Sequence, residues 1–258
     1  MDPTGRSTSP PTSHRLVLLL ISRGIAVLNL DASTISKIFR GEIRSWQDPA
    51  LTALNPKVQL LDLPITAVAR SDDSGTTENF TEYLHSVAPD AWPDAPDGSW
   101  PASSGIEHAQ GNTGVVTTVT RTVGAIAYAD DSLVDESLGK ARLKVGASYV
   151  QVSGPAAARA VAESERVEGR GPHDIALKLD RETTAPGAYP LVLVSYLVFC
   201  SSYSDPQTVQ LVKSFGQYVV SEEGQQEATE SAKSAPMPPQ LAHEASEAID
   251  SITLRSAN

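Results

Sequence analysis

The segment Ala69-Arg-Ser-Asp-Asp-Ser-Gly-Thr-Thr-Glu-Asn-Phe80 decides the fold predicted for this chain. It follows a β-rich, alternating stretch from Leu63 to Ala69, which predicts a short strand. Apolar residues then recur at helical spacing, at Phe80, Tyr83, Leu84 and Val87. A turn between a strand and a helix points free backbone N–H groups at whatever lies beside it. The segment therefore predicts a strand, an anion-binding turn and a helix.

The residue types in this turn suit a small oxyanion. Ser74 supplies a hydroxyl, Gly75 allows close approach, and Thr76 adds a hydroxyl at the positive end of the helix. Arg70 adds a planar fork of donors. We therefore expect an anion site formed by Arg70, Asp72, Ser74, Gly75 and Thr76. The same run also suits an ordinary helix N-cap, and spacing alone does not decide between the two interpretations.

Asp72 requires a separate explanation, because a carboxylate beside an anion site is unfavourable without a partner. Either it holds Arg70 in place, or it accepts a proton from the ligand. Phosphate near neutral pH carries such a proton, whereas sulfate carries none and would meet only repulsion. The second arrangement would therefore select phosphate over sulfate.

Composition narrows the class of protein. The 258 residues carry a formal net charge of −11 and are 40% hydrophobic, enough to build the core of one or two lobes. Without a basic stripe, nucleic acid is not expected as a partner. The single cysteine, Cys200, excludes an internal disulfide and is expected to be an inert buried thiol. The five histidines show no metal-ligand spacing, so no metal site is predicted.

The beginning of the chain predicts little regular structure. Met1 to Ser13 is rich in Pro, Ser and Thr, which predicts a disordered tail. Leu16 to Ile21 is apolar but too short to span a membrane. No small-residue cleavage site follows it and no lipidation cysteine lies near the start, so a secretory signal is not expected. Arg15 to Leu30 is expected to form a strand and a turn.

The C-terminal part predicts a strand followed by helices. Leu191 to Cys200 is a long apolar run, expected to form a strand buried on both faces. A helix beginning after Asp205 is expected to turn its apolar residues inward, among them Leu211, Phe215 and Tyr218. A last amphipathic helix is expected from Leu241 to Ile252.

Several motifs, in order, resemble those of the phosphate-binding proteins that serve phosphate ABC importers. The run Arg70 to Thr77, followed by Asn79-Phe80-Thr81-x-Tyr83-Leu84, resembles the family signature. The other matching pieces are Ile38-Phe-Arg-Gly-Glu-Ile43 with Trp46 and Asp48, Leu54-Asn55-Pro56, Gly111-Asn-Thr-Gly114 before Gly124-Ala-Ile-Ala-Tyr128, Tyr189-Pro190, and Pro236-Met-Pro-Pro239. Together they extend from about Leu28 to the C-terminus.

The resemblance implies an α/β fold, two-lobed and periplasmic-binding-protein-like, with mixed sheets flanked by helices. Family members carry a long segment upstream of the equivalent of Leu28, with further loops that contact phosphate. The first lobe is therefore expected to be incomplete and to leave apolar surface exposed. The expected division is 1–24 as a disordered tail and remnant strand, 25–189 as the second lobe with the anion motif, and 190–258 as the segment that returns to the first lobe.

The resemblance also implies a function. It predicts a monomeric bacterial protein, periplasmic or on the cell surface, that captures inorganic phosphate for the membrane permease subunits of a phosphate ABC importer. It predicts no cofactor and no enzymatic activity. One alternative is a truncated or degenerate relative that does not bind phosphate alone. Another is a phosphoryl-handling enzyme with Asp72 or Asp73 as nucleophile or base, which would need a metal or a second catalytic group.

Overall fold

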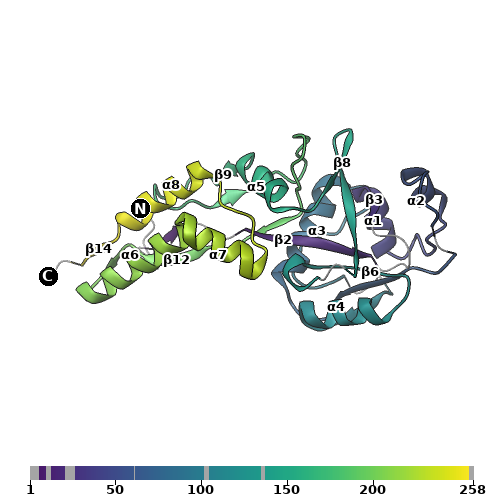
Figure 1. The fold of residues 1–258 in the computed structure, drawn as a ribbon, viewed down its shortest axis with the longest axis horizontal. Helices are drawn as coiled ribbons and strands as arrows, with labels where there is room; N and C mark the ends of the chain where they lie inside the picture. Colours follow the sequence, from purple (N-terminus) through teal and green to yellow (C-terminus); the bar gives the residue numbers. More distant parts are fainter. Residues whose placement is uncertain are drawn as a thin grey trace.

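The computed structural model describes residues 6–9, 13–20, 27–60, 62–101, 105–134 and 137–255. Figure 1 shows an elongated molecule in which the main sheet and helices α1 to α4 lie at one end, while α6, α7 and α8 gather at the other. Strand β2 (Ser13–Leu20) runs from one group toward the other. The two ends of the molecule are called here the sheet lobe and the helical lobe.

The sheet lobe is built on an eight-stranded mixed sheet. Six of its strands follow the order β3-β7-β2-β6-β4-β5, and the other two are β11, which pairs with β2, and β8, which pairs with β7. Strand β2 is antiparallel to both β6 and β7, whereas β4 lies parallel between β6 and β5. Mixed strand directions with helices packed against the sheet confirm the predicted α/β fold class.

The remaining elements have the following bounds. The strands are β1 Arg6–Ser9, β3 Val27–Leu30, β4 Thr66–Arg70, β5 Glu107–Ala109, β6 Ala125–Asp130, β7 Gly139–Val145, β8 Ser148–Gln151, β9 Glu165–Arg166, β10 Leu177–Lys178, β11 Val192–Val194, β12 Leu197–Cys200, β13 Ser202–Tyr203 and β14 Thr253–Leu254. The helices are α1 Ala32–Phe39, α2 Pro49–Leu54, α3 Gly75–Val87, α4 Gly111–Arg121, the short 3-10 turn η1 Asp131–Leu133, α5 Gly154–Ala162, α6 Pro206–Val220, α7 Glu222–Ala232 and α8 Pro239–Asp250.

The predicted strand, turn and helix around Ser74 are confirmed. The strand, β4, begins three residues later than expected, and α3 begins at Gly75 with Ser74 as its N-cap. The helix buries Phe80, Tyr83 and Leu84 on the face that the sequence spacing indicated. Fully burying a side chain of this size contributes about 1.5–3 kcal/mol. The packed face therefore fixes the start of α3 against the carboxyl end of β4.

An aromatic cluster lies beneath this junction. The ring of Tyr128 on β6 stacks on Phe80 of α3, with centroids 4.4 Å apart, and on Trp100 at 5.7 Å. Phe39 of α1 meets Phe80 edge-on at 5.0 Å. Trp92, from the same proline-rich segment as Trp100, is buried. The tryptophans of this segment thus anchor it to the core.

The N-terminal expectation needs correction. Residues Arg6–Ser9 form β1, which pairs antiparallel with β12, so the expected disordered tail is wrong for this stretch. Strand β2 lies inside the main sheet, between β6 and β7. Pairing with distant strands supplies hydrogen bonds that composition alone does not reveal. The expected turn after β2 falls on residues 21–26, outside the described part of the chain.

Two further expectations for the C-terminal part are wrong. The apolar run does not form one buried strand: it divides into β11 and β12, and Cys200 at the end of β12 is exposed. Helix α6 does not bury Leu211, Phe215 and Tyr218, whose relative exposures are 70%, 51% and 47%. The broader expectation that this region exposes apolar surface is confirmed. The last helix, α8, spans Pro239–Asp250, close to the predicted range.

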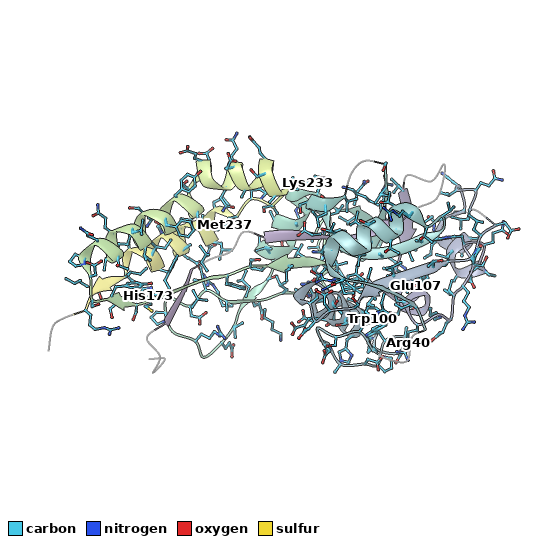
Figure 2. All side chains as sticks on the ribbon, turned by 90° about the horizontal axis from the view of Figure 1, so that it is seen from below. Arg40, Trp100, Glu107, His173, Lys233 and Met237 are labelled. Carbon is cyan, nitrogen blue, oxygen red and sulfur yellow. The ribbon has the colours of Figure 1, made fainter. Side chains whose placement is uncertain are left out.

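The helical lobe is tied back to the sheet lobe by a charged side chain. Lys233, at the end of α7, adopts a left-handed backbone with φ of 49°. Its Nζ donates to the carbonyl oxygens of Val134 at 2.8 Å and Asp131 at 3.2 Å. In Figure 2, Lys233 lies between Met237 on the helical side and Glu107 on the sheet side. Among the described helices, none combines the length and apolarity needed to cross a bilayer.

Candidate functional site

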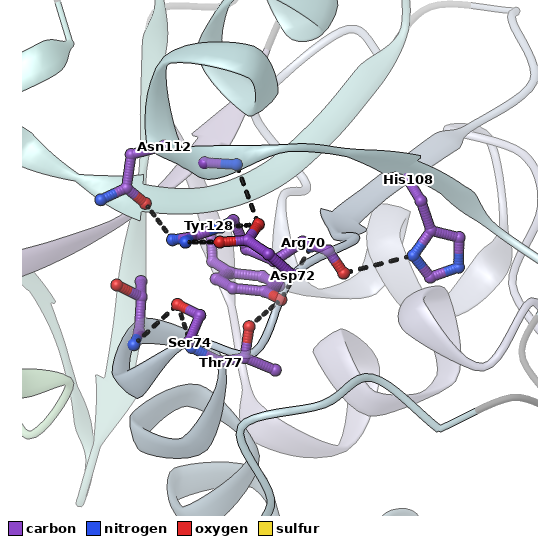
Figure 3. Close-up of polar contacts among 9 residues, drawn as sticks. Arg70, Asp72, Ser74, Thr77, His108, Asn112 and Tyr128 are labelled. Carbon is purple, nitrogen blue, oxygen red and sulfur yellow. Dashed lines mark hydrogen bonds and ion pairs between the residues drawn. The ribbon is translucent and has the colours of Figure 1, made fainter.

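The predicted site residues converge where β4 ends and α3 begins. Figure 3 shows Arg70, Asp72 and Ser74 at this junction, with Asn112 of α4 and Tyr128 of β6 beside them. Because β4 and β6 are parallel neighbours, their carboxyl ends meet at the same edge of the sheet. This edge is where open α/β sheets bind ligands.

Arg70 and Asp72 form a two-pronged ion pair. Arg70 Nε donates to Asp72 Oδ1 at 2.8 Å, and Nη2 donates to Oδ2. The Arg70 side chain is only 10% exposed. The hydrogen bonds from Arg70 and from the Gly111 amide hold the pKa of the Asp72 carboxyl well below its usual range, and the same pair raises the pKa of Arg70. Of the two roles expected for Asp72, the structure shows the one in which it holds Arg70.

Two residues at the start of α4 also bind the Arg70–Asp72 pair. They were not among the site residues predicted from the sequence. The amide of Gly111 donates to Asp72 Oδ1 at 2.9 Å, and Asn112 Oδ1 accepts from Arg70 Nη1 at 3.1 Å. Gly111 has φ of +65°, a conformation that favours glycine. In the sequence the Gly-Asn pair was visible as part of a motif that resembles the family, but not as a partner of Arg70 and Asp72. The contact between Asn112 and Arg70, which lies about forty residues earlier in the chain, can be seen only in the folded structure.

The start of α3 differs from the expectation of several free amides. The amides of Thr76 and Thr77 donate to Ser74 Oγ at 3.1 and 3.4 Å, so both already have a partner. This is the N-cap arrangement, the alternative that the sequence left open. The Gly75 amide has no hydrogen bond among the described residues, and Gly75 itself is exposed. A serine hydroxyl that accepts from amides still has its own hydrogen to donate. Among the described residues, the donors that remain at this helix start are therefore Ser74 Oγ, the Gly75 amide and the Thr76 hydroxyl.

The hydroxyl of Tyr128 links strand β4 to helix α3. Its hydroxyl accepts from the Arg70 amide at 3.2 Å and shares a hydrogen bond with Thr77 Oγ1 at 2.8 Å. Burial raises the pKa of Tyr128, so the phenol stays protonated at neutral pH. The backbone of Arg70 and the first turn of α3 are thus held in a fixed relation by one buried hydroxyl.

Two more groups define the rim of the site. His108 lies on the edge strand β5, and its Nδ1 is 3.3 Å from the Arg70 carbonyl oxygen, so it contacts backbone rather than the guanidinium. The Ser74 amide donates to the Gly98 carbonyl at 3.0 Å. A Cβ at Gly98 would lie 2.1 Å from Asp73 Oδ1 and 3.3 Å from the Ser74 amide nitrogen, so a larger residue here would displace the Asp73 side chain.

A cavity of about 240 Å³ lies beside Gly75. One wall carries Asn79 of α3, whose buried Oδ1 has no partner among the described residues. The rest of the lining is mixed. It combines the apolar Pro96, Leu177, Leu179, Leu193 and Val194 with Glu78, Glu82, Arg181 and Tyr196.

This arrangement presents hydrogen-bond donors of the kind that suit an anion. Asp72 uses one oxygen for two hydrogen bonds and the other for Arg70, which leaves it poorly placed as a nucleophile. Within the described residues, no three or more His, Cys, Asp or Glu side chains are grouped to hold a metal ion. The chemistry that the geometry supports is hydrogen bonding by Arg70, Ser74 and Gly75 to a small oxyanion.

Comparison with curated proteins adds evidence from sequence. The chain is 32% identical over 236 residues to the phosphate-binding protein PstS 2 of Mycobacterium tuberculosis, an alignment that covers 90% of this chain and 62% of that protein. It is 35% identical over 202 residues to PstS 3 of Mycobacterium leprae, covering 76% of this chain and 54% of that protein. The chain thus spans roughly three fifths of the length of these relatives.

Solved structures support the same fold. A phosphate-binding protein from Stenotrophomonas maltophilia superposes with a TM-score of 0.69 at 18% identity, covering 94% of this chain and 70% of that one. A periplasmic phosphate-binding protein, PfluDING, solved with bound phosphate, gives a TM-score of 0.68 at 19% identity, covering 92% and 70%. At these identities the likeness establishes the two-lobed binding-protein fold and nothing finer.

A family model described as the PBP superfamily domain matches residues 17–223, which is most of the chain and includes the whole site around Arg70. The motif-based resemblance to phosphate-binding proteins is confirmed by the curated relatives. This chain therefore belongs to the PBP superfamily, as a relative of the phosphate-binding proteins.

Proposed function

We propose that this protein is the substrate-binding component of an ABC importer and captures inorganic phosphate. The ligand would lie at the start of α3, contacted by Arg70, Ser74, Gly75 and Thr76, with Asp72 orienting the arginine. In this proposal Arg70 Nη1 or Nη2, the Ser74 hydroxyl and the Gly75 amide donate to phosphate oxygens. The relatives named as phosphate-binding proteins support the choice of ligand.

The observation that carries the proposal is the fixed geometry of Arg70. Its guanidinium is held by Asp72 on one side and Asn112 on the other, at the positive end of a capped helix. A donor fork fixed before the ligand arrives loses little conformational entropy on binding. A site that only capped α3 would not need a guanidinium fixed in this way.

The direct test is calorimetric titration of the purified chain with phosphate and with sulfate. We expect heat from phosphate, because Arg70, Ser74 and the Gly75 amide donate to its oxygens. Sulfate should give a similar response if Asp72 only holds Arg70, and little response if Asp72 also accepts a hydrogen bond from the protonated ligand. Ser74→Ala should weaken phosphate binding about 10- to 100-fold, since a hydrogen bond to a charged group contributes about 1.5–3 kcal/mol.

Ser153→Ala is the matched control for this substitution. Ser153 is the N-cap of α5 and accepts from the Ala156 amide, so its loss also removes a serine cap. Both variants should lose about 1 kcal/mol of stability. Only Ser74→Ala should weaken phosphate binding. Equal phosphate affinity in the two variants would show that Ser74 is a structural cap alone.

A second candidate is a family member that does not bind phosphate by itself. The observation that favours it is that the Thr76 and Thr77 amides are already satisfied by Ser74. It predicts no phosphate heat and an unchanged unfolding midpoint in phosphate, whereas a ligand that binds only the folded state must raise that midpoint.

The wider assignments belong to this proposal as well. Presentation of phosphate to membrane permease subunits, a periplasmic or cell-surface location and a monomeric state follow from the proposed role. The absence of enzymatic activity also remains a prediction, which a phosphatase assay with and without magnesium would check. The division into lobes at 25–189 and 190–258 is the corresponding structural expectation, with ligand closure between them.

A further inference from the structure

An open space lies beside Gly75, at the start of α3. A Cβ added at Gly75 would meet no other part of the described chain within 4 Å, and Gly75 does not have a positive φ. Neither packing nor backbone conformation therefore requires glycine at this position. Gly75 also lines the cavity of about 240 Å³ described above. Because the Gly75 amide is one of the donors proposed for phosphate, this cavity lies directly beside the proposed phosphoryl site.

One buried acceptor in the lining of this cavity lacks a donor. Asn79 follows Gly75 by one turn on the same face of α3 and is 5% exposed. Its Nδ2 donates to the Val192 carbonyl at 2.6 Å, which fixes the orientation of the amide. Its Oδ1 has no hydrogen-bond partner among the described residues. A buried acceptor without a donor is unfavourable, so Asn79 Oδ1 favours a ligand that brings a hydrogen-bond donor.

Two other polar residues of the lining already have partners. The Tyr196 hydroxyl accepts from the Leu177 amide at 2.9 Å. Arg181 donates to the Glu82 carboxylate and to two backbone carbonyls, so its charge is matched. Glu78 adds a further carboxylate to the lining. A second anionic group on the ligand would therefore be repelled, whereas a neutral hydroxyl would not.

The size and the apolar part of the cavity favour a short organic group. A water molecule takes about 30 Å³ of the liquid, so the cavity holds about eight groups of that size. The apolar residues that line it are Pro96, Leu177, Leu179, Leu193 and Val194. Contact with such side chains favours carbon atoms over water. The cavity thus suits a short carbon chain that carries a hydroxyl.

We propose that this site accepts phosphate monoesters of short polyols as well as inorganic phosphate. The phosphoryl group would lie at the start of α3, where Arg70, Ser74 and the Gly75 amide donate to its terminal oxygens. The ester oxygen would direct the carbon chain past Gly75 into the cavity, where a hydroxyl would donate to Asn79 Oδ1. The inference rests on the proposed function, because it uses the same phosphoryl site, and it widens the class of substrate.

Calorimetric titration of the full chain with inorganic phosphate and three esters tests this assignment. Glycerol 3-phosphate, n-propyl phosphate and 3-phosphoglycerate all carry a three-carbon chain and differ in its polar groups. We expect glycerol 3-phosphate to bind at least as tightly as inorganic phosphate and to compete with it. The propyl ester, which has no hydroxyl, should bind about 3- to 10-fold more weakly than glycerol 3-phosphate. The carboxylate of 3-phosphoglycerate should weaken binding at least about tenfold.

The variant Asn79→Leu tests the proposed contact with the ligand hydroxyl. It removes the free acceptor together with the bond to the Val192 carbonyl. Glycerol 3-phosphate and n-propyl phosphate should then bind with equal affinity. Comparison of two ligands in two proteins isolates the contact, because a general effect of the substitution changes both affinities alike.

A cavity-filling substitution locates the carbon chain. Leu179→Trp enlarges a side chain of the lining and should lower the ratio of glycerol 3-phosphate affinity to phosphate affinity at least about tenfold. Leu211→Trp makes the same change on α6, at a residue that is 70% exposed and outside the cavity, and should leave this ratio unchanged. Thermal unfolding confirms that each variant is folded.

Three results would overturn the proposal: weaker binding of glycerol 3-phosphate than of inorganic phosphate, equal binding of glycerol 3-phosphate and n-propyl phosphate by the wild type, or an affinity ratio that Leu179→Trp leaves unchanged. The titrations also separate this inference from the proposed function. Binding of inorganic phosphate without the esters would sustain the proposed function and end the inference. Binding of glycerol 3-phosphate without inorganic phosphate would do the reverse, and binding of neither would end both.

Discussion

Asp72 binds the guanidinium of Arg70, which lies two residues earlier in the chain. Arg70 Nε is 2.8 Å from Asp72 Oδ1, and Nη2 is bonded to Oδ2. The pair lies at the carboxyl end of a buried strand, so the backbone on one side of it is fixed by the sheet. Arg70 is therefore a positioned donor and not a mobile surface cation. This relationship is the basis for two of the predictions below.

Replacing Arg70 should abolish most phosphate binding. Arg70→Ala removes the donor fork and leaves Asp72 as an unmatched negative charge beside the anion. We expect phosphate affinity to fall by on the order of a hundredfold or more, from the 1.5–3 kcal/mol of a charged hydrogen bond plus the added repulsion. Arg142→Ala, at an exposed position on β7, is the control and should bind normally in the same calorimetric titration. Normal affinity in Arg70→Ala would place the ligand elsewhere.

The Arg70–Asp72 pair should persist in mild acid. The pKa of Asp72 is depressed in the folded state, chiefly by hydrogen bonds from Arg70 and then from Gly111. Its contribution to stability is therefore fully present above the unfolded pKa of about 3.9 and is lost as pH falls through the lower folded value. Unfolding curves of the wild type and Asp72→Asn should keep a constant separation from pH 7 to about pH 5 and converge below about pH 3.9. Convergence already near pH 6 would refute the assigned pairing.

The Tyr128 hydroxyl should matter for both stability and binding. Tyr128→Phe leaves the ring stack intact but removes the bonds to the Arg70 amide and Thr77 Oγ1. We expect a loss of about 1–2 kcal/mol in the free energy of unfolding, together with weaker phosphate binding. Tyr203→Phe removes another tyrosine hydroxyl that accepts a backbone amide, that of Cys200, in the helical lobe. It should cost stability without changing phosphate affinity, and an equal loss of affinity in both variants would argue against a positioning role for Tyr128.

Arg181 should be more important for stability than Glu82, its ion-pair partner. Its buried guanidinium donates to the carbonyls of Pro190 and Val192 as well as to Glu82. The Arg181 side chain is 4% exposed and that of Glu82 is 47% exposed. Arg181→Met should cost about 3 kcal/mol, because the buried Pro190 carbonyl loses its Arg181 donor and the Val192 carbonyl is left with Asn79 Nδ2. Glu82→Gln should cost about 1 kcal/mol or less, since water screens this carboxylate.

Denaturant unfolding measures both changes. Arg170→Met is a suitable control, since its pair with Asp174 is more exposed at the arginine and should contribute little. A larger loss for Glu82→Gln than for Arg181→Met would mean that the charge pair, and not the carbonyl contacts, stabilises this junction.

The parts of the fold that local sequence determines were predictable. The strand before Arg70, the Ser74 cap and the apolar face of α3 all follow from residues within one short segment. Asn112 and Tyr128 could not be assigned to the site, because their contacts with Arg70 depend on how the strands are ordered in the sheet. Pairing of β1 with β12 was unpredictable for the same reason.

Helix α6 illustrates a different limit. Its apolar residues occur on more than one side, and periodicity does not tell which side a neighbour covers. Helix α8 covers the side of α6 that carries Gly216, whereas Leu211, Phe215 and Tyr218 are exposed. The error over Cys200 has a similar origin, since an apolar run shows what could be buried but not whether a second layer is present.

The mutual neutralisation of Arg70 and Asp72 has a further consequence. A matched pair of opposite charges projects almost no field at long range, so an approaching anion is held only at contact distance, by donors already in place. Dissolved salt weakens interactions beyond a Debye length, about 8 Å at physiological ionic strength, and affects contacts shorter than this much less. Contacts within the site should therefore change little with ionic strength, whereas the long-range repulsion between a chain of net charge −11 and its anion is weakened by salt.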